Sequence, residues 1–136
     1  MPVKPENIDK YPDNWKQISS YIRFVRAKNH CEVCGVRNYS IIERHKYGKW
    51  SYVSQALMDQ LYSKIKYAGH NMTTALRYFG FVKVILTTAH LDHNPENCDH
   101  DNLKAMCQKC HNSYDAEHRK QTRREAKLKG QLKLSI

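Results

Sequence analysis

Two Cys-x-x-Cys pairs limit the possible folds of this chain more than any other feature. They are Cys31-Glu-Val-Cys34 and Cys107-Gln-Lys-Cys110, and residues 35–106 separate them. Four thiolates at this spacing suit the tetrahedral coordination of zinc, and Gly35 can adopt the positive φ that such a turn often needs. We therefore expect one structural Zn²⁺ that closes a long loop and adds folding free energy that a small core lacks.

Two disulfides in a secreted domain are the alternative. The opening residues Met1-Pro-Val-Lys-Pro-Glu contain no apolar run of the kind found in a signal peptide, and Cys98 would be left without a partner. Both observations favour zinc and a reducing compartment.

The stretch from Leu86 to His111 is dense in histidine, carboxylate and cysteine side chains. Within it, Ala89-His90, Asn102 and the His111 that follows Cys110 form a pattern that resembles the HNH nuclease family. The ββα-metal module of that family is commonly held together by two Cys-x-x-Cys pairs. The resemblance covers Cys31 to Gly35 and roughly Val82 to His118.

The resemblance implies a role for each of three residues. His90 would end a strand and act as general base on water, Asn102 would brace the loop by hydrogen bonds to backbone, and His111 would begin a helix and bind a catalytic divalent cation such as Mg²⁺ or Mn²⁺. Hydrolysis of a phosphodiester needs a deprotonated water and positive charge near the phosphate oxygens, which a neutral imidazole and a metal ion supply.

One position departs from the family pattern. Many members place Asp or His directly before the general base as a metal ligand, and Ala89 stands there in this chain. Asp92 or His93 must then supply the missing ligand. In a second register, Asp92 and His93 are the ligand and the base and His90 is an accessory residue. The longer interval from His90 to Asn102 favours His90 as the base. His100 and Cys98 are expected to be ordinary loop residues without a metal role.

Length and charge fit a single nucleic-acid-binding domain. The 136 residues are 40% hydrophobic, which allows one domain with a modest core. The chain has 23 Lys+Arg against 13 Asp+Glu and a net charge of +10, which favours an anionic partner. No apolar run approaches the roughly 20 residues that span a bilayer, so we expect a soluble protein. The resemblance suggests a cytoplasmic protein of a bacterium or bacterial virus.

The expected fold is a small α+β domain with a zinc-stapled ββα-metal core, an N-terminal helix and a helical insertion. Residues 1–12 hold three of the four prolines and read as an extended arm. Hydrophobic periodicity predicts helices over about 14–28, 51–68 and 111–129, paired strands over 39–50 that turn near Gly48, and a strand over 81–89. Residues 38–80 form the insertion between the two cysteine pairs, and 71–80 are ambiguous.

The last part of the chain, residues 119–136, is strongly basic. Its cations, with Glu125 as the single acidic residue among them, suit a phosphate backbone, and the residues expected to bind nucleic acid are Arg119, Lys120, Arg123, Arg124 and Lys127. Asp115 lies one helical turn after His111 and could orient it.

The sequence thus predicts a metal-dependent endonuclease that cleaves DNA, with double-stranded DNA as the expected substrate and a homodimer as a means of cutting both strands. A zinc-stabilised nucleic-acid-binding module that does not cleave is the alternative, and Ala89 keeps it open. A third class is an interaction protein that docks an acidic protein partner. The chain has no internal repeat and no phosphate-binding glycine loop, so an NTPase is not supported.

Overall fold

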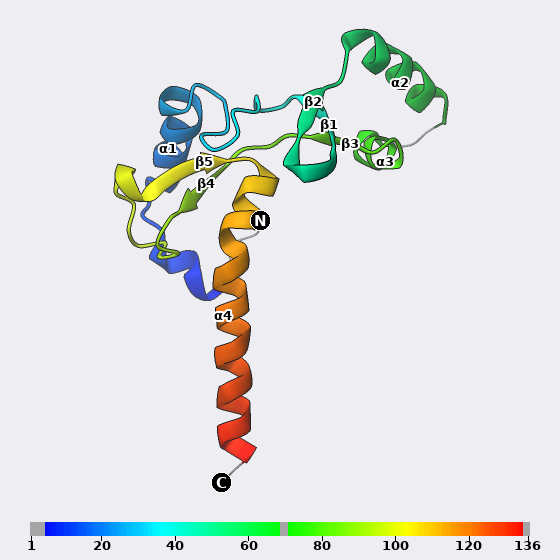
Figure 1. The fold of residues 1–136 in the computed structure, drawn as a ribbon. Helices are drawn as coiled ribbons and strands as arrows, with labels where there is room; N and C mark the ends of the chain where they lie inside the picture. Colours follow the sequence, from blue (N-terminus) through cyan, green and yellow to red (C-terminus); the bar gives the residue numbers. More distant parts are fainter. Residues whose placement is uncertain (1–4, 69–70, 135–136) are drawn as a thin grey trace.

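The computed structural model describes residues 5–68 and 71–134, and it is a small α+β domain with antiparallel sheets (Figure 1). One sheet has three strands in the order β2-β1-β3, and the other is the two-stranded ribbon β4-β5. The strands are β1 (Ile41–Arg44), β2 (Trp50–Tyr52), β3 (Phe81–Lys83), β4 (Thr87–His90) and β5 (Leu103–Met106).

The N-terminal segment is helical. Residues 5–10 form the short 3₁₀ helix η1 (Pro5–Lys10), so the expectation of an extended arm is wrong for these residues, and residues 1–4 lie outside the described chain. The expected helix over 14–28 is confirmed as α1 (Trp15–Ser20) and the π-helical segment η2 (Tyr21–Arg26). Ile22 is fully buried on its inner face.

The insertion contains most of the three-stranded sheet and two helices. The expected hairpin is confirmed: β1 pairs with β2, and Tyr47 and Gly48, in the short helical turn η3 (Lys46–Gly48), have positive φ. Helix α2 (Gln55–Ala68) starts later than expected, because the Ser54 hydroxyl, and not that of Ser51, accepts the Leu57 N–H. The ambiguous segment forms α3 (Met72–Tyr78), capped by the Asn71 side chain at the Thr74 N–H.

The strand expected over 81–89 is divided between the two sheets. β3 pairs with β1, whereas β4 pairs with β5. Between them the Leu86 N–H donates to the Asn38 side chain and the Ile85 N–H to the Gln108 side chain, at 3.0 and 3.3 Å. Side chains thus satisfy the backbone where a continuous ladder was expected. The apolar run is still buried, because Leu86 fills the main core.

The ribbon β4-β5 leads into the long helix α4 (Gln108–Leu134). The 3₁₀ turn η4 (His100–Asn102) precedes β5, and α4 starts three residues before the expected position and continues beyond Lys129. The C-terminal half of α4 projects away from the rest of the domain (Figure 1). Among the described helices, none is both long and apolar enough to cross a membrane.

The core has two parts. The larger lies among η2, the ribbon and the first cysteine pair, and its fully buried members include Ile22, Val36, Ile42, Val84, Leu86 and Leu103. The smaller joins the insertion helices to the three-stranded sheet through Met58, Leu61, Leu76 and Phe81.

Candidate functional site

The four expected zinc cysteines converge on one point. The sulfur atoms of Cys31, Cys34, Cys107 and Cys110 all lie within 4.8 Å of one another, and every cysteine of the chain is a free thiol. The Cys34 and Cys107 sulfurs are 3.8 Å apart. A Zn–S bond of about 2.3 Å places the sulfurs of a tetrahedral site about 3.8 Å apart, so these four side chains can hold a metal ion such as zinc.

Local backbone geometry builds this centre. Gly35 has φ +80° and donates its N–H to the Cys31 carbonyl, which closes the first turn. The Cys31 sulfur accepts the N–H groups of Cys34 and Cys107 at 3.5 and 3.3 Å. A hydrogen bond from the Cys107 thiol lowers the pKa of Cys31, burial opposes this effect, and these backbone groups lower the pKa further. Metal binding requires the thiolate form of the cysteines.

A cluster of histidines lies on one face of α4. The His111 Nε2 is 3.1 Å from a carboxylate oxygen of Asp115, and the His93 Nδ1, from the loop after β4, is 3.5 Å from the other oxygen. The His93 ring stacks on that of His118, with centroids 3.9 Å apart. On its other side, His111 Nδ1 is 2.8 Å from the Thr87 hydroxyl of β4. We call His93, His111, Asp115 and His118 the histidine cluster.

Local structure explains how His93 reaches α4. His93 has φ +59°, and its N–H donates to the His90 carbonyl, which turns the chain directly after β4. Its ring also stacks beside that of Tyr114, whose hydroxyl donates to the Leu91 carbonyl. Burial lowers the pKa of His93, and the neighbouring His118 lowers it further, while Asp115 and Asp92 oppose this effect.

His90 does not join the histidine cluster. Its ring stacks on Trp15 of α1 with centroids 4.8 Å apart, and it meets Tyr11 edge to face. Thr88, on the same face of β4, bonds to Ser19 of α1, whereas Thr87 on the other face bonds to His111. Because side chains alternate along a strand, His90 and His111 lie on opposite faces of the ribbon. Burial lowers the pKa of His90.

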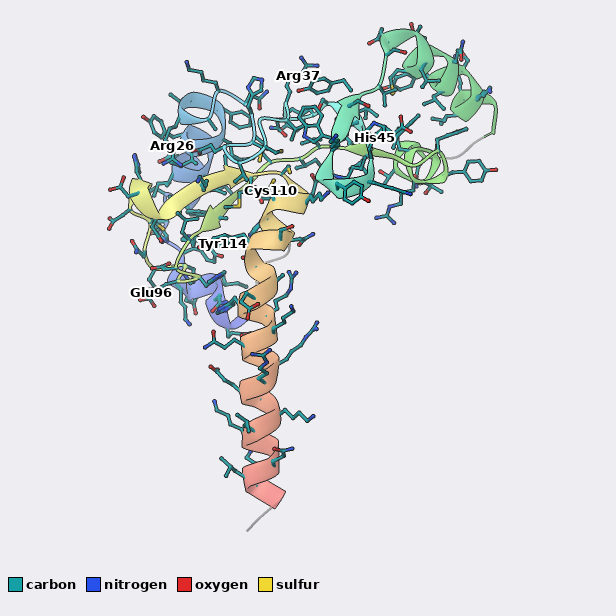
Figure 2. The ribbon with its side chains drawn as sticks, in the orientation of Figure 1. Arg26, Arg37, His45, Glu96, Cys110 and Tyr114 are labelled. Carbon is teal, nitrogen blue, oxygen red and sulfur yellow. The ribbon has the colours of Figure 1, made fainter. Side chains whose placement is uncertain are left out.

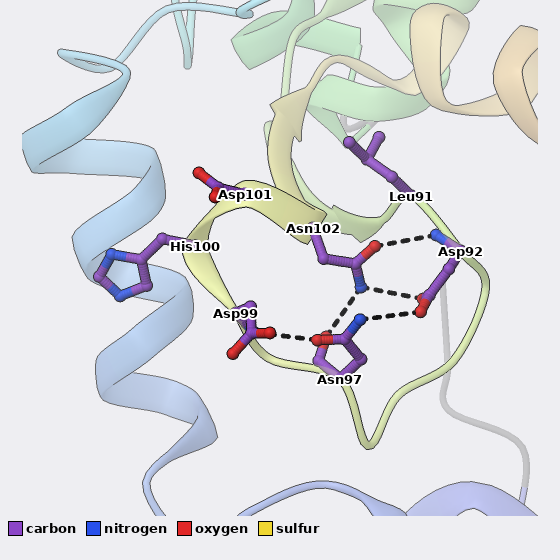
Figure 3. Close-up of a pocket in the computed structure, with 7 residues that line it drawn as sticks. All are labelled: Leu91, Asp92, Asn97, Asp99, His100, Asp101 and Asn102. Carbon is purple, nitrogen blue, oxygen red and sulfur yellow. Dashed lines mark hydrogen bonds between the residues drawn. The ribbon is translucent and has the colours of Figure 1, made fainter.

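Asn102 and Asp92 brace the loop between β4 and β5. The Asn102 side chain accepts the Asp92 N–H and donates to the Asn97 carbonyl and to the Asp92 carboxylate, at 2.8 to 3.1 Å. Figure 3 shows these bonds around an open pocket lined by Leu91, Asp92, Asn97, Asp99, His100, Asp101 and Asn102. Hydrogen bonds from the Asn97 side chain, the Asn94 N–H and Asn102 lower the pKa of Asp92 to about 2.

These bonds decide the position of Asp92. Its carboxylate is engaged inside the loop, with the Asn97 amide at 2.9 Å, and it does not join His111. Asp115 instead supplies the carboxylate beside His111.

Two residues have structural roles that sequence reasoning did not assign. Arg26 donates to the carbonyls of His100 and Leu103 and pairs with Glu32 at 2.8 Å. It thereby joins η2 to the start of β5. Cys98, expected to be an ordinary loop residue, has its sulfur 3.6 Å from the His90 Nε2. Neither contact could be predicted from the spacing of residues in the sequence.

Within the described residues, the cysteine tetrad is the one group of three or more ligand-type side chains whose donor atoms all gather tightly enough for an ion. The fold and this centre define a small α+β protein with a cluster of four cysteines that could hold a metal ion. The chain has no significant match among protein-family models, curated proteins or solved structures.

Proposed function

We propose that this protein is a metal-dependent endonuclease that hydrolyses phosphodiester bonds of DNA, with an active site of the HNH type. The meeting of His93 with His111 and Asp115 carries the proposal, because it places two imidazoles and a carboxylate beside the loop after β4. The order of β4, β5 and α4 and the loop bonds of Asn102 support it. We further propose Zn²⁺ as the ion of the cysteine tetrad.

His111 and Asp115 are the proposed ligands of a catalytic divalent cation. They are one turn apart on α4, half-buried, and already within hydrogen-bond distance of each other. A mixed imidazole and carboxylate pair suits Mg²⁺, Mn²⁺ or a transition metal. When bound, such a cation supplies positive charge that stabilises the phosphate oxygens in the transition state. In this assignment Asp115 takes the role of the metal ligand that many HNH nucleases have at the position of Ala89.

His93 is the proposed general base, as in the second of the two registers, although Asp115 and not Asp92 is the proposed carboxylate ligand. The Asp115 carboxylate lies 3.5 Å from Nδ1 of His93 and so can orient the ring, and Nε2 is then the atom that would take a proton from the attacking water. The lowered pKa of His93 favours the neutral imidazole, which is the form able to accept a proton. His118 holds the ring from its stacked side.

A plasmid nicking assay with Mg²⁺ or Mn²⁺ tests these roles. We expect His93→Ala and His111→Ala each to lower the nicking rate by about 10²-fold or more, the usual contribution of a general base. His90→Ala is the matched histidine control, and we expect it to change the rate by less than about tenfold, since removal of a group outside the reacting atoms acts only through folding. Loss of nicking in His90→Ala alone would instead establish the first register.

A non-cleaving nucleic-acid-binding module is the second candidate. The position of His90 against Trp15, on the ribbon face opposite His111, favours it, because the residue that the HNH resemblance assigns as base is enclosed by aromatic rings. Salt-sensitive DNA binding by a parent protein that does not nick DNA would select this candidate. Binding to an acidic protein without affinity for DNA would select an interaction protein.

A further inference from the structure

The structure has a second polar surface on α4, away from the histidine cluster. An open groove of about 620 Å³ separates the first turns of α4 from the three-stranded sheet and α3. Its lining includes the cations Arg44, Arg77 and Lys109 and the neutral hydrogen-bonding residues Gln108, Asn112 and Ser113, and it contains no carboxylate. In the part of the chain that is described, none of these three cations forms an ion pair.

The groove has a fixed floor. The Gln108 side chain donates to the Lys83 carbonyl at 2.9 Å and accepts the Ile85 N–H, which ties the start of α4 to the segment between β3 and β4. A second hollow of about 370 Å³ shares Arg44, Lys109 and Ser113 with the groove and adds the indole of Trp50. The charged groove and an apolar wall are therefore continuous.

The cations of the groove continue along α4. Positions 109, 113, 116, 120, 123 and 127 follow steps of three and four residues and so share one face of the helix. Four of them, Lys109, Lys120, Arg123 and Lys127, are basic, and none is acidic, although Glu117 lies on the flank. At about 1.5 Å per residue this stripe is about 27 Å long.

A surface of this length fits a polyanion. A single phosphate or nucleotide is too short to reach from Arg44 to Lys127, whereas a nucleic-acid strand repeats its charge every few ångströms. The Asn112 amide and the Ser113 hydroxyl between the cations can donate to phosphate oxygens, as protein contacts to nucleic-acid backbones commonly do. Trp50 can contact sugar or base surface at the upper end.

We propose that the groove and stripe formed by Arg44, Arg77, Lys109, Lys120, Arg123 and Lys127 bind the phosphate backbone of DNA. The choice of DNA among polyanions rests on the proposed function. Residues 109 and 111 are about 200° apart around α4, so this surface and the histidine cluster occupy nearly opposite faces of the helix. A DNA molecule bound in the groove would therefore have to extend around α4 for one of its phosphodiester bonds to reach the histidine cluster.

Fluorescence anisotropy with a labelled DNA duplex, without added divalent cation, tests the surface. The groove variant combines Arg44→Gln, Arg77→Gln and Lys109→Gln, and the control removes the same charge elsewhere through Lys16→Gln, Lys64→Gln and Lys66→Gln. We expect the groove variant to bind at least tenfold more weakly near 0.1 M salt. Its plot of log affinity against log salt should be shallower by about 2 to 3, since each phosphate contact contributes about 0.9. The control should bind within about threefold of the parent.

Equal weakening of the groove variant and the control would overturn the proposal, because net charge alone would then explain binding. Preference for polyglutamate over the duplex would also overturn it, in favour of an acidic polypeptide. A matched circular dichroism spectrum and thermal midpoint establish that the groove variant is folded, and a stripe variant (Lys120→Gln, Arg123→Gln, Lys127→Gln) tests the same surface away from the core. Anisotropy without divalent cation measures binding and not nicking, so failure of cleavage and failure of this surface are separate results.

Discussion

The imidazole of His90 stacks on the indole of Trp15 at a centroid distance of 4.8 Å and an interplanar angle of 25°. This pair fixes the ribbon against α1 and removes His90 from the face that carries His111. Burial there favours the uncharged ring, so the contact links the ionisation of His90 to folding.

The free energy of unfolding should therefore decrease as the pH is lowered through the ordinary titration range of histidine. The pKa of His90 is lower in the folded state than in the unfolded chain. As the pH falls below about 6.5, the unfolded chain therefore binds more protons than the folded protein does, and the stabilisation that is present at higher pH is lost. Urea unfolding of the parent and of His90→Gln between pH 8 and pH 5.5 measures this effect. The difference between the two proteins should shrink as the pH falls, and a difference independent of pH would contradict the assignment.

Loss of one metal-binding thiol should destabilise the whole domain. We expect Cys107→Ser to lower the bound zinc from about one ion per chain and the free energy of unfolding by several kcal/mol, because zinc in small domains contributes about 10–16 kcal/mol of binding free energy. Cys98→Ser is the matched control and should keep its zinc. Elemental analysis and thermal unfolding give the two readouts. Zinc-free parent protein with unchanged stability would rule out the centre.

Removal of the Asn102 side chain should loosen the loop after β4. Asn102→Ala leaves the Asp92 N–H and the Asn97 carbonyl without this partner, and we expect a loss of about 1–2 kcal/mol, the lower part of the usual range, because the loop is partly open to water. Asn102→Asp keeps the size but loses the donor to Asp92 and adds charge repulsion, so it should destabilise at least as much. Urea unfolding measures both, and a neutral Asn102→Ala would show that the brace is not needed.

Two glycines should respond to alanine with opposite signs. Gly35→Ala meets no atom within 4 Å but forces alanine to φ +80°, so we expect a loss of about 1–2 kcal/mol from backbone strain alone. Gly130 lies within α4 with equally open surroundings, and Gly130→Ala should stabilise the helix by about 0.5–1 kcal/mol. Thermal unfolding tests both. The same sign for both variants would contradict the conformational explanation.

Short-range features of this fold could be read from the sequence. The two Cys-x-x-Cys turns, the hairpin at Gly48 and the helix around Ile22 depend on local spacing and turn chemistry, and the structure has each of them. The coarse α+β class followed from the same patterns. The broken strand over 81–89 could not be foreseen, because Asn38 and Gln108, distant in sequence, supply the hydrogen bonds that end the ladder.

The composition of the histidine cluster was also only partly predictable. His111 and Asp115 share a helix face by spacing, and that relation holds in the structure. The loop histidine that reaches them is determined by the left-handed turn at His93 and by the face of β4 that meets α1. The number of residues between each histidine and Asn102 contains no information about either feature. The catalytic roles themselves, the metal at the cluster and DNA as substrate stay predictions until the assays above are done.

Cys110 and His111 are consecutive residues in the first turn of α4, so one short piece of backbone belongs to both the sulfur centre and the histidine cluster. A movement of this shared backbone displaces the two groups together. If the four thiols hold an ion, its removal by a chelator should therefore disturb the arrangement of the histidine cluster before the chain unfolds.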